Sequence, residues 1–313
     1  MSAAASRCAV GVDIGGTKTV AALVDGSGAV IGRAAEPTPG GDGPDAILAT
    51  ALRLVKAVAD GTRPLGVGIG SAGVIDHRSG VVLSATSVLR DWAGTLVRER
   101  ISDATALPVQ VVNDVHAHAL GEAWIGAAAG AGSMLMVAVG TGVGASFVHG
   151  GEVLFGAHCV AGHLGHVPSA AAGSRLCVCG RVGHLEAVAA GPALTASYSE
   201  LVGRPVSTLQ EVVRDAVAGS EAARVVVTDG AKALGAAVGG AVNLLDPEVV
   251  VIGGGVVGAG QMWWRPMERA LRDELLPATA DVQVCGSRLG SDAALVGAAR
   301  LVLTDDFRTK GKR

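Results

Sequence analysis

Short apolar runs alternate with helix-like patterns along the whole chain, and this alternation predicts an α/β protein. Two strand-like runs, residues 8–14 and 20–24, flank a Gly-Gly-Thr turn. A hairpin signal at residues 25–28 (DGSG) leads to a third strand near residues 29–34. After a polar loop, residues 45–60 place their apolar side chains on one helical face. The chain therefore opens with strands and continues with helices and strands in alternation.

The rest of the pattern predicts more buried strands and helices, with a polar, frayed end after residue 304. A long loop is expected from residue 69 through Trp92. The other strands are expected at residues 65–69, 109–112 and 249–252, and the other helices at residues 115–125, 209–217, 222–245, 267–275 and 293–302.

The opening pattern recurs once in the middle of the chain. The order of strand, Gly/Thr turn, strand, hairpin and strand is repeated, in that order, by residues 134–139, 140–144, 145–148, 149–152 and 153–155. The alternative is that hairpins rich in small residues resemble one another by chance. The matched turn spacing and threonine placement favour two halves of one architecture.

Composition narrows the possible partners to small molecules or a second copy of the chain. Half of the 313 residues are apolar, which is enough for one large or two ordinary domains. The formal charge of −3 gives no electrostatic signature for nucleic acid or an anionic membrane. Residues 123–148 carry no charge, but their glycines and strand-length apolar core indicate a buried strand rather than a membrane span. Residues 1–7 contain no apolar signal region and the cysteines number five, so we expect a cytoplasmic protein without disulfides.

A glycine turn with a carboxylate before it, DIGGTK at residues 13–18, follows the first predicted strand. Such a turn can direct backbone N–H groups and a hydroxyl at a phosphate, while the aspartate holds a hydrated Mg²⁺. The alternative is an ordinary hairpin turn. The second turn at residues 140–144 favours phosphate binding. The candidates are Asp13, Gly15, Gly16, Thr17 and Lys18 in the first turn, and Thr141 and Gly142 in the second.

The pair Asn113-Asp114 ends a predicted strand and opens a helix. A helix cap is one explanation of such a pair. The other is catalytic, because ligands of α/β proteins bind at the carboxyl ends of strands and phosphoryl transfer to an alcohol needs an aspartate that accepts the hydroxyl proton. Three glycine segments also fit the dinucleotide fingerprint, at residues 68–73, 140–145 and 253–258, but none follows the first strand as a nicotinamide enzyme requires.

Four potential zinc ligands stand in a glycine-rich segment with the spacing H-x10-C-x-C-x4-H. Soft and borderline ligands of this kind suit a closed tetrahedral Zn²⁺ site. Buried thiols beside solvated histidines are the alternative, and His163 or Cys159 could replace a ligand. The predicted ligands are His166, Cys177, Cys179 and His184.

These motifs together resemble the ROK family (repressor, open reading frame, kinase) of sugar kinases over nearly the whole chain. The shared segments are DIGGTKT at 13–19, ND at 113–114, GTGVG at 140–144, GHLGH at 162–166, CVCGRVGHLE at 177–186 and the glycine segment ending at Val257. The resemblance implies a two-domain actin-like ATPase (ribonuclease H-like) α/β fold with an interdomain cleft, ATP with Mg²⁺, a sugar acceptor, a structural Zn²⁺ and a homodimer.

The resemblance also implies roles for individual residues. Asp114 is implied to be the catalytic base, both turns to cradle the ATP phosphates, and Gly254 and Gly255 to lie near adenosine. The zinc would order the sugar loop. The implied sugar-binding residues are Gly73, Asn113, His163, His166 and Glu186.

Two positions depart from the family pattern. Most relatives carry a cysteine where His184 stands, so the zinc site would have two histidines and two cysteines. Glucokinases of the family usually carry glutamate at the place of His163, whereas bacterial N-acetylmannosamine kinases resemble this chain in having histidine. An imidazole can donate a hydrogen bond to an amide carbonyl, whereas a carboxylate needs a hydroxyl donor. We therefore expect phosphorylation of the 6-hydroxyl of N-acetylmannosamine, with a glucokinase or another hexose or N-acetylhexosamine kinase as the alternative.

The expected domains are residues 1–118 and 119–290, with a helix at 291–304 returning to the first domain. Closure of the two domains over the substrates is expected, because phosphoryl transfer must exclude water. Residues 84–92 are expected to contribute to the sugar pocket. A sugar-responsive, non-catalytic regulator is a more distant alternative, which would need a DNA-binding module before the first strand.

Overall fold

The computed structural model describes residues 7–304, so the polar end predicted from residue 305 onward lies outside the described residues. The described chain forms two compact units. Unit 1 contains residues 7–130, 148–161 and 288–304, and unit 2 contains residues 131–147 and 162–287.

The sheet of unit 1 has the strand order β3-β2-β1-β4-β7. The first three strands along the chain pair antiparallel, and the later two extend the sheet in parallel fashion on the other side of β1. A two-stranded sheet, β5 (Val74–Asp76) and β6 (Val81–Ser84), lies in the segment where a long loop was expected, so that prediction was wrong. The five main strands are β1 (Cys8–Ile14), β2 (Lys18–Asp25), β3 (Val30–Pro37), β4 (Val67–Ser71) and β7 (Val109–Asn113).

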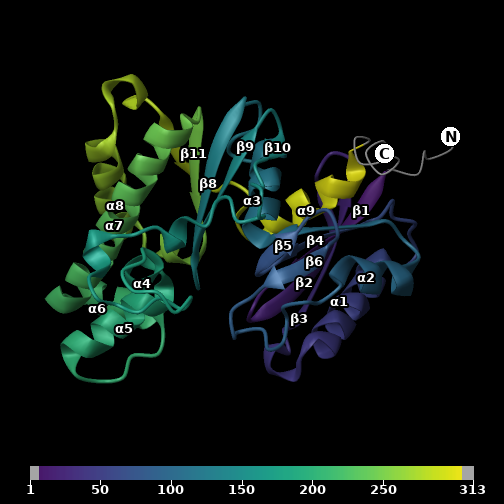
Figure 1. Cartoon of the computed structure of the whole chain (residues 1–313), viewed down its shortest axis with the longest axis horizontal. Helices are drawn as coiled ribbons and strands as arrows, with labels where there is room; N and C mark the ends of the chain where they lie inside the picture. Colours follow the sequence, from purple (N-terminus) through teal and green to yellow (C-terminus); the bar gives the residue numbers. More distant parts are fainter. Residues whose placement is uncertain (1–6, 305–313) are drawn as a thin grey trace. The chain divides into compact units, whose positions relative to one another are not determined.

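Helices cover both faces of this sheet because its central strand is apolar on both sides. Val10 and Val12 of β1 share a core with α1 (Pro44–Ala59), whereas the alternate residue Ala9 shares a core with α9 (Ala293–Leu303). Figure 1 shows α9, in yellow, beside β1. Gly11 permits this approach, because a Cβ there would overlap the backbone of Leu295. The other helices of unit 1 are α2 (Val97–Thr105) and α3 (Asp114–Trp124).

The second sheet has the strand order β10-β9-β8-β11-β12, which reproduces the order of the first sheet. In both sheets a Gly/Thr turn connects two neighbouring strands, and the later strands add in parallel fashion. The structure therefore confirms the predicted duplication. The strands are β8 (Ser133–Val139), β9 (Val143–His149), β10 (Glu152–Val153), β11 (Val249–Gly253) and β12 (Gln283–Gly286).

The core of unit 2 forms between strands β8 and β11 and the long helix α7 (Glu221–Leu245), which packs beside α8 (Gln261–Glu274) (Figure 1). By length and composition α7 could cross a membrane, but half of its most apolar window is buried in the protein, which is typical of a core helix. The helix expected at residues 267–275 begins six residues earlier, before Pro266, because the apolar stripe of Trp263, Met267 and Leu271 continues through the proline. The remaining helices are α4 (Glu186–Ala189), α5 (Gly191–Val202) and α6 (Leu209–Val217).

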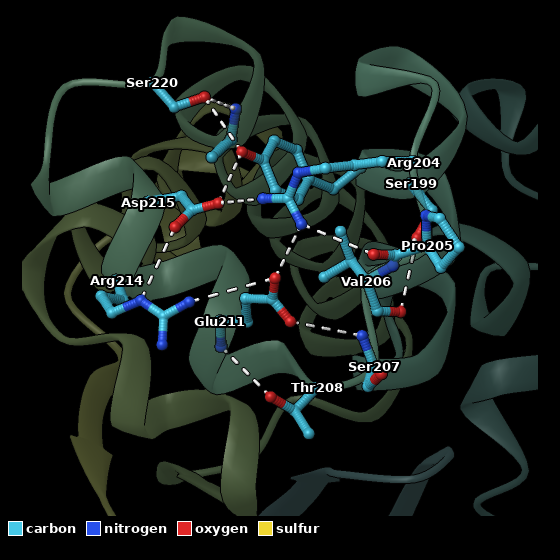
Figure 2. A network of polar contacts seen from close by, with 12 residues as sticks. Ser199, Arg204, Pro205, Val206, Ser207, Thr208, Glu211, Arg214, Asp215 and Ser220 are labelled. Atoms are coloured by element: carbon cyan, nitrogen blue, oxygen red, sulfur yellow. Dashed lines mark hydrogen bonds and ion pairs between the residues drawn. The ribbon is translucent and has the colours of Figure 1, made fainter.

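A polar network closes the loop between α5 and α6 (Figure 2). The guanidinium of Arg204 donates to Glu211 at 2.8 Å and to Asp215 at 2.7 Å. The Tyr198 hydroxyl, from α5, donates to the same carboxylate of Asp215 at 2.9 Å. Thr208 caps α6 by accepting from the N–H of Glu211 at 3.2 Å. These contacts fix α6 against α5 at one end of unit 2.

Candidate active site

Asp13 and Asp114 lie at the carboxyl ends of parallel strands in unit 1. The sheet register pairs Asp13 of β1 with Gly70 of β4, and Ser71 of β4 with Asn113 of β7. Asp114 follows directly as the first residue of α3. Ligands of α/β proteins bind outside the carboxyl ends of such strands. The fold thus brings two predicted site carboxylates to one edge of one sheet.

The two carboxylates influence each other. Burial is the main cause that raises the pKa of Asp13 from 3.8 to about 7, and the negative charge of Asp114 adds to it, while Lys18 opposes the change. A cation at Asp13 would relieve both the burial and the repulsion. Carboxylate oxygens are the ligands that Mg²⁺ takes in proteins. The residues present therefore fit a hydrated Mg²⁺ at Asp13.

The turn after β1 is tight and presents its polar side chains to solvent. The N–H of Gly15 donates to the carbonyl oxygen of Lys18 at 3.1 Å. A Cβ on Gly16 would lie 2.5 Å from Cγ1 of Val88, so a larger residue there would require the Val88 side chain to move. Thr17 and Lys18 are exposed. Their hydroxyl and ammonium groups are accessible to a ligand of unit 1.

Asn113 is the N-cap of α3, so the capping interpretation is correct for this residue. Its Oδ1 accepts from the N–H of Val115 at 2.9 Å and of His116 at 3.4 Å. Its Nδ2 donates to the carbonyl oxygen of Gly73 at 3.0 Å, which brings together two predicted sugar-binding residues. Asp114 accepts from the same N–H of Val115 at 3.0 Å. The cap fixes the backbone from which the Asp114 carboxylate extends.

The corresponding turn of unit 2 lies beside a carboxylate of its own. The Glu186 Oε2 accepts from the N–H of Val143 at 2.8 Å, and a Cβ on Gly142 would lie 2.6 Å from that oxygen. Thr141 is exposed and lines a cavity of about 370 Å³ together with Glu186 and Arg175. The sequence interpretation missed Arg175, whose only signal is a positive charge two residues before the first predicted cysteine ligand.

Gly254 and Gly255 follow β11, the central parallel strand of unit 2. Gly254 has φ of 94°, and a Cβ there would overlap the backbone of Val139 in β8. Both glycines are exposed. A ligand could approach the backbone closely at this position.

The four predicted zinc ligands gather in unit 2 with their ligand atoms within 4.8 Å of one another. Sγ of Cys177 lies 3.6 Å from Nδ1 of His166, and Sγ of Cys179 lies 3.2 Å from Nδ1 of His184. Zn–S bonds of about 2.3 Å and Zn–N bonds of about 2.0–2.1 Å place sulfur and nitrogen about 3.6 Å apart in a tetrahedral site. The donor set and its spacing therefore fit Zn²⁺. Cys159, considered as a substitute ligand, lies in unit 1 and outside this cluster.

His163 lies beside the predicted zinc cluster. Its ring centroid is 6.0 Å from that of His166, and the two rings are inclined by 28°. The preceding Gly162 has φ of 90°, and its carbonyl oxygen accepts from the N–H of Ala145 at 2.6 Å. These contacts seat the GHLGH segment against β9, so the position of His163 depends on the segment that also supplies His166.

Comparison with known proteins assigns the chain to a family. A model of the ROK family matches residues 9–305. A glucokinase from Halalkalibacterium halodurans is 33% identical over 315 aligned positions, covering 95% of each chain. An N-acetylmannosamine kinase from Citrobacter koseri is 33% identical over 297 positions, covering 94% of this chain and 98% of the relative.

Solved structures agree with this assignment. A ROK hexokinase from Thermus thermophilus matches with a TM-score of 0.84 and 34% identity, over 97% of this chain and 99% of the other. A ROK family glucokinase from Streptomyces griseus, in complex with glucose and AMPPNP, matches with a TM-score of 0.80 and 30% identity, over 94% and 98%. The chain therefore belongs to the ROK family and has its actin-like α/β fold.

Proposed function

We propose that this member of the ROK family transfers the γ-phosphate of ATP to the 6-hydroxyl of a hexose, with glucose as its preferred acceptor. The protein is an ATP-dependent sugar kinase. Glucokinases from three bacteria, at 30–33% identity, and a related structure with glucose and AMPPNP support glucose over the N-acetylmannosamine expected from the sequence. The observation that carries the proposal is the pair of carboxylates, Asp13 and Asp114, at the carboxyl ends of parallel strands.

Asp114 acts as the base in this proposal. It accepts the proton of the acceptor hydroxyl as that oxygen attacks the γ-phosphorus, and a positioned base of this kind contributes roughly 10²–10⁴-fold to a rate. Its backbone is fixed by the Asn113 cap, and the amide of Asn113 is oriented by Gly73. Asp13 would hold a hydrated Mg²⁺, which would supply positive charge to the phosphate oxygens.

The two glycine turns bind the nucleotide phosphates in this proposal. In unit 1 the exposed Thr17 hydroxyl and Lys18 ammonium face a ligand. In unit 2 the exposed Thr141 hydroxyl and the backbone at Gly142 face the ligand. The backbone beside Gly254 and Gly255 lies against the adenosine, because neither residue has a side chain to block a flat base.

A structural zinc is the second part of the proposal. The ion orders the segment that carries His163, His166 and Glu186, and it takes no part in the chemistry. Support comes from the ligand distances of the four-residue cluster and from its place directly before Glu186.

N-acetylmannosamine is the second candidate acceptor, and His163 is the observation that favours it. An imidazole N–H can donate to an acetamido carbonyl, whereas the glutamate usual in glucokinases accepts from a hydroxyl. Similarity to N-acetylmannosamine kinases, at 33% identity for the Citrobacter koseri protein, supports this candidate as well.

A coupled ADP-release assay over glucose, mannose, fructose, N-acetylglucosamine and N-acetylmannosamine tests the proposal. We expect the highest kcat/KM with glucose, and N-acetylmannosamine as best substrate would establish the second candidate instead. His163→Glu should raise the ratio of kcat/KM for glucose to kcat/KM for N-acetylmannosamine roughly tenfold or more. The glutamate gains a hydrogen bond from a glucose hydroxyl, and the hydrogen bond from the imidazole to the acetamido carbonyl is lost. His158→Glu, at an exposed position five residues earlier, is the matched control. ADP release that no sugar stimulates would refute the kinase proposal.

A further inference from the structure

Three potential metal ligands of unit 1 lie together in a cluster distinct from the four-residue cluster of unit 2. Asp76 ends β5, His77 follows it in the turn to β6, and Cys159 lies in the loop after β10. One ligand atom from each lies within 4.8 Å of those of the other two. Sγ of Cys159 is 3.7 Å from Nδ1 of His77. This is close to the sulfur-to-nitrogen separation of about 3.6 Å that a tetrahedral zinc site imposes.

Neighbouring groups hold the first two side chains in place. Oδ1 of Asp76 accepts from the N–H of Arg78 at 3.0 Å, and Oδ2 accepts from the hydroxyl of Ser79 at 2.6 Å. The His77 ring stacks on Phe155 with centroids 3.8 Å apart and planes inclined by 8°. Metal-binding carboxylates and imidazoles are commonly oriented by such outer contacts. The ligands are therefore positioned before a metal arrives.

Cys159 is the third member and the most constrained. Its side chain is buried, and its backbone has φ of 59°, a left-handed conformation that is uncommon for residues other than glycine. The loop turns through this conformation with the sulfur against the His77 ring nitrogen. A metal–sulfur bond would offset the cost of that conformation.

The charges at this place suit a divalent cation. The Asp76 carboxylate and a Cys159 thiolate together neutralise two positive charges, and a metal bound there deprotonates the thiol. Two cations, Arg78 and Arg98, act on His77. Arg98 donates to backbone oxygens, including that of His77 at 2.7 Å, and to Gln110 at 2.9 Å.

We propose that Asp76, His77 and Cys159 bind a Zn²⁺ ion in unit 1, separate from the four-residue cluster of unit 2. Three protein ligands leave a fourth position for water, as in zinc sites that exchange a ligand. His77 also lines a cavity of about 400 Å³. Carboxylate, imidazole and thiolate together favour zinc over Mg²⁺ or Ca²⁺, which take oxygen ligands.

Zinc content per chain, measured by mass spectrometry on protein purified in metal-free buffer, tests the proposal. Cys159→Ser and His77→Phe should each contain one zinc fewer than the wild-type protein. The phenylalanine keeps the stack on Phe155 but removes the ligand nitrogen, so it covers the case in which the serine variant fails to fold. Cys285 and His158 do not belong to the cluster, so the Cys285→Ser and His158→Phe variants should keep the wild-type zinc content. The difference between variants does not depend on whether the unit 2 cluster binds zinc.

Cobalt substitution gives a second, spectroscopic measurement. Co²⁺-loaded wild-type protein should lose part of its thiolate-to-cobalt charge-transfer absorption on Cys159→Ser and none on Cys285→Ser. Ser79→Ala removes the hydrogen bond to Asp76 and should weaken Co²⁺ binding at this site by roughly 10–100-fold. Equal zinc content in the wild-type, Cys159→Ser and His77→Phe proteins, with an unchanged cobalt spectrum, would overturn the proposal.

Discussion

The raised pKa of Asp13 makes the stability of unit 1 depend on pH in a direction opposite to that of most carboxylates. At pH values below about 3.8 the carboxyl group is protonated in the folded and unfolded chains, and it costs nothing. As the pH rises toward 7, the unfolded chain has lost this proton while the folded chain still binds it, so the free energy of unfolding falls. Above pH 7 the penalty is complete.

The size of the penalty follows from the change in pKa. A rise from 3.8 to about 7, at about 1.36 kcal/mol per pH unit, gives roughly 4 kcal/mol at pH 8. Asp13→Asn removes the charge and keeps the shape of the side chain. We therefore expect this variant to be more stable than the wild-type protein at pH 8 by up to about 4 kcal/mol, and equally stable near pH 4.

Urea unfolding at pH values between 4 and 8, followed by circular dichroism, measures this difference. Asp25→Asn is an informative control, because hydrogen bonds, first of all from the Ser27 hydroxyl, lower the pKa of Asp25. The stability from Asp25 is present at neutral pH and lost in acid, so its variant should show the opposite pH trend. Mg²⁺ with ATP should shrink the Asp13→Asn difference at pH 8, because the cation stabilises the ionised carboxylate. A difference that is the same at pH 5 and pH 8 would refute the assigned burial of Asp13.

Further predictions concern the base, the packing, the cap and the metal. Asp114→Ala should lower kcat roughly 10²–10⁴-fold with glucose binding by calorimetry largely intact, and near-normal turnover would remove it as the base. Gly68→Ala should cost about 1–3 kcal/mol in urea unfolding, because its Cβ would overlap the carbonyl of Ala298 in α9. Thr208→Ala should cost about 1 kcal/mol in thermal unfolding because α6 loses its cap, and an unchanged melting temperature would contradict this role. Chelation of zinc should expose residues 163–186 to proteolysis, and full glucose turnover by zinc-free protein would contradict the structural role.

Local patterns were sufficient to predict most of the fold. The apolar face of α1 and the recurrence of the Gly/Thr turn are visible in the sequence. The two sheets have the same strand order because the strand–turn–strand pattern occurs in both halves of the chain. The small sheet of β5 and β6 was missed, since Val74–Asp76 is too short to show a period. Residues 148–161 join unit 1 through contacts distant in sequence, which no local pattern records.

The site could be predicted in its residue types but not in its contacts. Asp13 and Asn113-Asp114 are recognisable because each stands at the end of a short apolar run and is followed by a glycine turn or a helical pattern. The Val143 N–H donates to Glu186, and Arg175 lines the unit 2 cavity. Both contacts depend on how the segment with the predicted zinc ligands folds back on β9. The same holds for Cys159, whose partner His77 stands 82 positions away.

The two related turns differ in what their carboxylates still need. In unit 1 the half-buried Asp13 carboxyl group lies near a second negative charge, and both effects raise its pKa to about 7. A bound cation would oppose this rise. In unit 2 the Glu186 carboxylate already accepts a backbone N–H from the turn, at 2.8 Å. The same strand–turn–strand arrangement therefore lies beside different carboxylates in the two units. Asp13 in unit 1 would be stabilised by a cation, whereas Glu186 in unit 2 already accepts a hydrogen bond. For this reason we expect the nucleotide's metal at the first turn, and hydrogen bonds to phosphate or sugar oxygens at the second.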